Sequence, residues 1–249
     1  MKLRFEERPY AGKTFRPRPE IYLDEAAQLL IVATPWGTRA AAKTTIERMT
    51  DFLSTREDRE ATSPFERLSC LSTQANNLRI SALLANEAIY REDNLQEYRS
   101  GVELFAAVVD DNEIVWIQSG NPQILLGRQN RSLLPLGSQV DLAFDLTPSG
   151  EKLFAPLPSQ LLGLDTSLNL NINSFRAQPG DRVVLLSHSH LPEALFTMKE
   201  AQTDLDQLSR ALARIYPDLA FWLGILTFAD DANAETSDTS MERNQEQFG

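Results

Sequence analysis

The chain has 249 residues, a length that fits one large domain or two smaller ones. Its formal net charge of −11 argues against nucleic acid or an anionic membrane as a partner, because both require clustered Lys and Arg. The single cysteine, Cys70, excludes an intrachain disulfide and a cysteine zinc cluster. No apolar run has the length of a membrane helix or a signal peptide, so we expect a cytoplasmic protein.

The N-terminal part predicts an arm, a buried strand and a helix. Residues 1–20 are polar and contain several prolines, which is typical of an arm or edge strand that leads into a loop. The apolar run 28–33 predicts a buried strand, which we expect residues 34–37 to break. Residues 38–54 then have helical spacing, with Thr38 as the candidate N-cap.

A second helix is predicted to begin at a capping box. Ser63 stands at the N-cap position, Pro64 follows at the first helical position, and Glu66 stands at the third. Apolar residues at helical spacing continue this pattern to about residue 91. Cys70 falls inside the pattern, so we expect it to be a small buried residue.

The rest of the chain predicts strands paired as hairpins. The runs 102–109 and 114–118 are joined by residues 110–113, a composition suited to a turn. Runs 124–126 and 133–136 form a second candidate hairpin, and strands 183–187 and 221–228 flank a helix over 203–215. Residues 229–249 are acidic and polar, so we expect a folded body over 1–228 and a disordered tail. Long helices with hairpin strands indicate an α+β layered sandwich.

Several segments between residues 16 and 228 resemble one known family. They are ANEAI (85–89), GVELFAA (101–107), GNPQILL (120–126) and PGDRVVLLSHSH (179–190). Their order and spacing resemble the metal-dependent protein phosphatases of the 2C type, the PPM family. The resemblance implies a four-layer α/β/β/α sandwich with two central antiparallel β-sheets flanked by helices. It also implies two Mn²⁺ or Mg²⁺ ions, held by carboxylates, that activate a water molecule toward phosphoserine or phosphothreonine.

Most of the family's metal-binding aspartates are replaced in this chain. Thr34 stands where the family has the Asp that bridges both metals, Asn121 replaces the Asp of G-D-S-R, and His188 replaces the Asp of S-D-G-L. The matches that remain are Arg16 as a phosphate-binding candidate and Glu20 as a ligand in the first motif, with Asp218 in the last. Two dications would face each other with too little negative charge between them.

We therefore expect no catalytic residues, no bound metal and no other cofactor. The predicted function is that of a pseudophosphatase, an adaptor or regulator in signalling that binds a protein partner, phosphorylated or not. The alternative is an active serine/threonine phosphatase with an altered metal set of Glu20, His188 and Asp218. In that alternative Mn²⁺ or Mg²⁺ is the cofactor and Arg16 clamps the phosphate.

The two histidines of the chain, His188 and His190, stand one residue apart at the end of a predicted strand. Both could point the same way and, with Asp218 or Glu20, form a two-histidine, one-carboxylate site for Zn²⁺ or Fe²⁺. The simpler interpretation is that they finish the strand and contact backbone or solvent. Adjacent strand residues face opposite sides, which disfavours Ser187 and His188 as a hydrolase pair. Arg16 and Arg18 could contact a phosphorylated partner, but the simpler interpretation is a solvated loop that carries ordinary charge. The remaining predictions place Trp116 and Trp222 in the core and Trp36 in the core or its rim.

Overall fold

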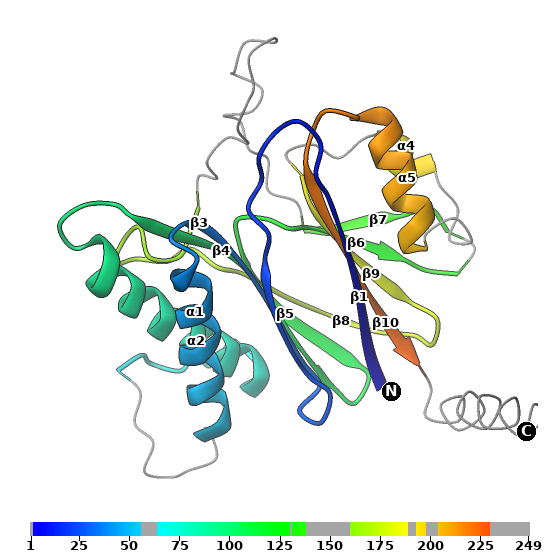
Figure 1. Cartoon of the computed structure of the whole chain (residues 1–249). Helices are drawn as coiled ribbons and strands as arrows, with labels where there is room; N and C mark the ends of the chain where they lie inside the picture. Colours follow the sequence, from blue (N-terminus) through cyan, green and yellow to red (C-terminus); the bar gives the residue numbers. More distant parts are fainter. Residues whose placement is uncertain are drawn as a thin grey trace, which may run out of the picture.

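The computed structural model describes residues 2–55, 64–129, 131–137, 160–188, 193–197 and 204–229. Two five-stranded antiparallel sheets lie face to face between helices, which confirms the predicted α+β four-layer sandwich (Figure 1). Residues 230–249, which contain nearly all of the predicted acidic tail, lie outside the described ranges.

The first sheet, here called the β1 sheet, has the strand order β1-β10-β9-β6-β7. Its strands are β1 (Lys2–Tyr10), β10 (Phe221–Ala229), β9 (Arg182–Ser187), β6 (Gln123–Gly127) and β7 (Leu134–Gly137). The polar N-terminal residues form β1, which lies at the edge of the sheet. Its neighbour, the apolar strand β10, pairs with β1 on one side and with β9 on the other. The register sets Tyr10 opposite Phe221, and Trp222 opposite Ser187, at one end of the sheet.

The second sheet, here called the β4 sheet, has the strand order β2-β3-β4-β5-β8. Its strands are β2 (Glu20–Asp24), β3 (Leu29–Gly37), β4 (Ser100–Asp110), β5 (Glu113–Ser119) and β8 (Asn171–Arg176). The predicted break after residue 33 is wrong, because β4 extends to Ser100 and pairs with β3 as far as Gly37. Both predicted hairpins are confirmed.

Helices cover the outer faces of both sheets. Helices α1 (Ala40–Thr55) and α2 (Thr73–Ile89) lie on the β4 sheet, and a π-helical turn, η1 (Tyr90–Asn94), follows α2. Helices α4 (Glu193–Thr197) and α5 (Leu205–Ile215) lie against the β1 sheet on the opposite side of the molecule (Figure 1). Within the described ranges, no helix is long and apolar enough to cross a membrane.

The core between the two sheets is aromatic and aliphatic. Trp116 and Trp222 are both buried there, as predicted. The same cluster contains side chains from both sheets, among them Leu30, Val32 and Phe105 on one and Leu3, Val183 and Leu185 on the other. This packing joins the sheets and fixes the ends of their strands relative to each other.

The predicted start of the second helix is wrong. Residues 64–72 are not helical, and α2 begins at Thr73 with Ser72 as the N-cap, whose hydroxyl accepts a hydrogen bond from the Ala75 backbone N–H. The side chain of Asn76 binds the backbone N–H and C=O of Leu68 and holds the preceding segment in a non-helical course with a turn at residues 69–70. Cys70 lies in this segment and is exposed, contrary to the prediction, while Ser63 lies outside the described residues.

Candidate functional site

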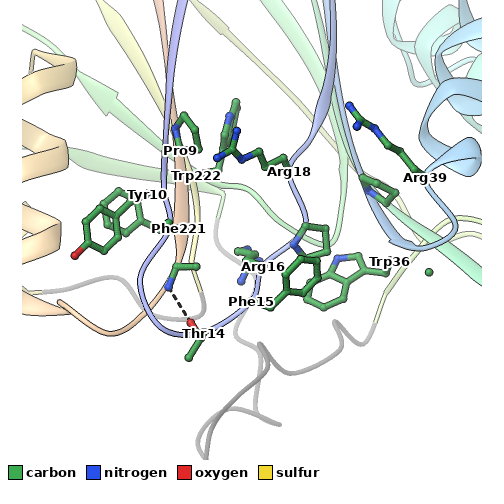
Figure 2. A pocket seen from close by; sticks show the side chains of 15 residues that line it. Pro9, Tyr10, Thr14, Phe15, Arg16, Arg18, Trp36, Arg39, Phe221 and Trp222 are labelled. Carbon is green, nitrogen blue, oxygen red and sulfur yellow. Dashed lines mark hydrogen bonds between the residues drawn. The ribbon is translucent and has the colours of Figure 1, made fainter.

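A cleft of about 730 Å³ opens at the end of the sandwich where β1 and β3 end and β10 begins. The loop of residues 11–19 crosses this end from the β1 sheet to the β4 sheet, and Figure 2 shows its side chains entering the cleft. The residues that line the cleft come from the loop and from the ends of the three strands: Pro9, Tyr10, Ala11, Thr14, Phe15, Arg16, Pro17, Arg18, Pro35, Trp36, Gly37, Arg39, Ala220, Phe221 and Trp222.

The start of the loop is anchored to the segment that precedes β10. The backbone C=O of Asp218 accepts hydrogen bonds from the N–H groups of Lys13 (2.7 Å) and Thr14 (3.0 Å). The Thr14 hydroxyl accepts a third, from the Ala220 N–H, at 2.8 Å (Figure 2). Gly12 permits this approach, because its φ is +51° and a Cβ there would lie 2.6 Å from the Ala220 nitrogen. These contacts fix how residues 15–18 enter the cleft.

A buried ion pair lies at the inner side of the cleft. The Arg16 Nη2 is 3.4 Å from the Glu103 Oε1, and the two side chains are only 4% and 0% exposed. The Asn121 amide donates to the same carboxylate oxygen at 3.1 Å. The Arg16 guanidinium also lies over the Trp36 ring, 5.7 Å from its centroid, in cation–π geometry. Strand pairing sets Thr34 directly opposite Glu103.

Glu103 is held in an environment that disfavours its charged form. Burial raises the pKa of its carboxyl group, and this effect exceeds the lowering by Arg16, the Trp36 indole and Asn121. Within the described part of the chain, the Oε2 atom of Glu103 makes no hydrogen bond. The single guanidinium therefore only partly compensates the cost of burying this carboxylate.

Neutral polar side chains are buried at the same end of the sandwich as the ion pair. Three of the family-matched positions, Thr34, Asn121 and His188, are buried at this end of the sandwich, and so are the neutral residues Gln118, Ser119, Gln123 and Ser187. The Gln118 amide donates to the Gly120 carbonyl at 2.9 Å, which satisfies the turn after β5. Of these neutral residues, Asn121 bonds directly to Glu103, and Thr34 stands opposite it on the neighbouring strand.

The matched carboxylates Glu20 and Asp218 are engaged by basic side chains. Glu20 accepts from the Arg39 Nε at 2.5 Å, and Asp218 pairs with the Lys13 Nζ at 2.8 Å, with its own side chain 58% exposed. His188 lies just after β9, is buried, and stacks on Tyr216 with ring centroids 4.9 Å apart. His190 lies outside the described residues.

The residues that the structure describes at this end of the sandwich do not fit a two-metal centre. Across the described ranges, no three His, Cys, Asp or Glu side chains are grouped so that they could hold a metal ion. The buried carboxylate at the cleft, Glu103, already faces a guanidinium. Mn²⁺ and Mg²⁺ need several oxygen ligands, many of them anionic, and neutral Thr34 and Asn121 do not supply that charge.

The sequence does not predict several residues of this site, among them Glu103, Phe15 and Arg39. Glu103 stands inside one of the segments that carry the family resemblance, and its signal was a lone charge in a run of buried apolar residues. Phe15, 63% exposed, and Arg39 also line the cleft, but residues of these types on loops give no distinctive pattern. Trp36, predicted in the core or its rim, is half-buried in the cleft wall.

Comparisons with known proteins identify the fold. Neither a protein-family model nor a curated protein matches the sequence. Among solved structures, the catalytic domain of the serine/threonine phosphatase PstP, in complex with two manganese ions, is 17% identical and has a TM-score of 0.63, with 92% of this chain and 99% of that chain covered. The PPM phosphatase MsPP from Mycobacterium smegmatis is 16% identical, with a TM-score of 0.64 and coverages of 91% and 98%.

A third structure supports the same conclusion. The serine/threonine phosphatase of S. agalactiae is 18% identical and has a TM-score of 0.62, with 92% of this chain and 100% of that chain covered. The likeness spans nearly the whole of each chain. The chain therefore has the fold of the PPM-type, phosphatase 2C-like serine/threonine phosphatases.

Proposed function

We propose that this protein is a catalytically inactive phosphatase 2C-like protein, a pseudophosphatase that binds a protein partner through its cleft. In this role it serves as an adaptor or regulator in signalling. The observation that carries the proposal is the buried Arg16–Glu103 pair, with neutral Thr34 opposite Glu103 and neutral Asn121 bound to it. The resemblance assigns the positions of Thr34 and Asn121 to metal-binding aspartates.

The charges at the site support the proposal that no catalytic metal ion binds beside Glu103. A divalent cation beside Glu103 would lie close to the Arg16 guanidinium and be repelled by it, more strongly in a buried site than in water. Arg16 does not lose its charge at accessible pH, so the repulsion cannot be relieved by deprotonation. The Arg16 guanidinium thus supplies the positive charge beside the Glu103 carboxylate. Unlike a metal ion, a guanidinium cannot activate a water molecule.

The lining of the cleft supports a binding role. It combines exposed aromatic surface with arginines, residue types that are enriched in protein–protein interfaces. Arg16 is engaged by Glu103, so contact with an anionic group of a partner falls to the exposed Arg18. The partner is a protein, in a phosphorylated or unphosphorylated state. The net charge of −11 disfavours nucleic acid and anionic membranes.

The alternative of an active phosphatase would use Glu20, His188 and Asp218 as metal ligands. No observation in the described structure favours it, because these side chains are engaged by Arg39, Tyr216 and Lys13 respectively. It would require all three to leave these contacts and converge on one ion.

Phosphate release from phosphoserine and phosphothreonine peptides tests the proposal. The full-length chain is incubated at high concentration with each peptide and Mn²⁺ or Mg²⁺, beside the variants His188→Ala and Asp218→Ala. We expect phosphate release no faster than in a protein-free control. Turnover by the wild type that both substitutions abolish would show an active enzyme and contradict the proposal.

A further inference from the structure

The charged residues of the cleft indicate which chemical group of a partner the cleft can bind. The residues that line it include three arginines and no Asp or Glu among the described positions, although the whole chain carries a net charge of −11. Such a local excess of positive charge in an acidic protein is complementary to an anionic group.

Two of these arginines have a counter-ion among the residues that the structure describes. Arg16 is paired with Glu103, and Arg39 with Glu20. Arg18 is exposed and forms no ion pair within the described part of the chain. In the described part of the chain, Arg18 is therefore the arginine of the cleft whose positive charge is not compensated. Figure 2 shows its side chain among the residues that line the cavity.

One positive charge matches a carboxylate better than a phosphate. A carboxylate carries a single negative charge, whereas a phosphorylated side chain carries about 1.5 to 2 at neutral pH. The second phosphate charge would meet arginines that are already neutralised, inside a protein with a large excess of acidic residues. A guanidinium and a carboxylate also form two parallel hydrogen bonds.

The rest of the cleft suits a large apolar side chain. Phe15 and Trp36 present aromatic surface, and Pro9, Pro17 and Pro35 add rigid apolar walls. The volume of about 730 Å³ lies within the range of pockets that bind small molecules, so it has room for a large side chain. The hydrogen bonds of Lys13 and Thr14 to Asp218 already order the loop, which reduces the conformational cost of binding.

We infer that the cleft binds an extended, unphosphorylated segment of a partner protein in which Asp or Glu lies beside a large apolar residue. Arg18 pairs with the carboxylate, and the apolar side chain packs against Phe15 and Trp36. This inference rests on the proposed binding role of the cleft and specifies its ligand.

The first experiment selects ligands without assuming a sequence. A phage-displayed library of random nonapeptides is panned on the full-length chain, on Arg18→Glu and on Arg4→Gln. Arg4 is a matched control, because it is also exposed and forms no ion pair in the described structure, but lies at the opposite end of β1. We expect the wild type and Arg4→Gln to enrich Asp or Glu within two residues of Phe, Trp or Leu, and Arg18→Glu not to.

The second experiment measures binding of a selected peptide by fluorescence anisotropy. Arg18→Gln and Phe15→Ala are each expected to weaken binding about tenfold or more, and Arg4→Gln less than twofold. Both changed side chains are exposed, so urea unfolding curves that superimpose on the wild type will show that folding is intact. Replacing the acidic residue of the peptide with phosphoserine is expected to weaken binding.

Three results would overturn the inference. They are a wild type that enriches no acidic–apolar motif, an Arg18→Glu variant that selects the same peptides, and a phosphoserine peptide that binds more tightly than the acidic one. The third result would leave the adaptor role intact and change only its ligand. Release of phosphate from that peptide with Mn²⁺ would instead contradict the pseudophosphatase proposal, whatever the anisotropy shows about the acidic peptide.

Discussion

Substitution of Arg16 by Met tests whether the buried ion pair holds the cleft together. The variant keeps most of the length of the side chain but leaves the Glu103 carboxylate buried without its guanidinium partner, while the Asn121 amide still donates to it. Removing one partner of a buried pair costs about 3–5 kcal/mol, because the other charge is left uncompensated. That is a large part of the total stability of a typical domain, about 5–15 kcal/mol.

The pH dependence of stability gives this prediction a second, independent measurement. Arg16 is the largest influence that lowers the pKa of Glu103, so its loss lets burial raise that pKa further above the unfolded value. A carboxyl group whose pKa is higher in the folded state than in the unfolded state binds more protons when the protein is folded. The free energy of unfolding therefore falls as pH rises from the unfolded pKa to the folded pKa. Arg16→Met should therefore lose stability more steeply than the wild type from about pH 4.5 toward neutrality.

Urea unfolding at several pH values measures both effects. The double variant Arg16→Met with Glu103→Leu should recover much of the loss, because it removes both charges. The matched control is Arg210→Met, which breaks the exposed pair with Asp206 and should change stability by less than about 1 kcal/mol. A cost for Arg16→Met as small as that of the control, with an unchanged pH slope, would refute the role of the ion pair.

Two further predictions concern stability away from the cleft. Ser72→Ala should lower the free energy of unfolding by about 1 kcal/mol, because it removes the N-cap of α2, and an unchanged urea midpoint would mean that the helix does not depend on this cap. Arg128→Met should cost about 3 kcal/mol in the same assay, because Asp181, with its side chain 1% exposed, loses a two-bond contact at 2.9 and 2.7 Å. A loss no larger than that of the exposed Arg210 control would contradict this reasoning.

The sequence predicts the fold well where the pattern of apolar residues decides the structure. The runs of β4, β5, β9 and β10 are continuous, and the turn between β4 and β5 has suitable residues, so their strands are evident. Strands β2 and β8 and the short helix α4 were not predicted. The burial of β8 alternates with much exposed polar surface, and its pairing with β5 is a tertiary contact that local sequence does not specify.

Helix α2 begins later in the chain than the sequence predicts, for a physical reason. The residues from Ser63 to Glu66 fit a capping box, but Asn76 draws the backbone of Leu68 into hydrogen bonds that a helix there could not make. Side-chain competition for backbone groups of this kind depends on the tertiary fold and is invisible in propensities.

The predicted roles of the site residues stay predictions. The motifs single out positions 34, 121 and 188, and all three side chains are buried in the structure. The pairing of Arg16 with Glu103 was not foreseen, since the two lie 87 residues apart and meet only because loop 11–19 crosses to the β4 sheet. Candidate ligands Glu20 and Asp218 were matched by sequence alone, and only the structure reveals their ion pairs with Arg39 and Lys13.

Direct titration of the purified chain with Mn²⁺, followed by electron paramagnetic resonance of the free ion, tests the central claim. We propose that the Arg16 guanidinium, and not a pair of metal ions, is the cation beside Glu103. We therefore expect the free Mn²⁺ signal to rise in proportion to added metal and to be the same for the wild type and Glu103→Gln. Two ions bound per chain, at protein concentrations of tens of micromolar, would contradict it.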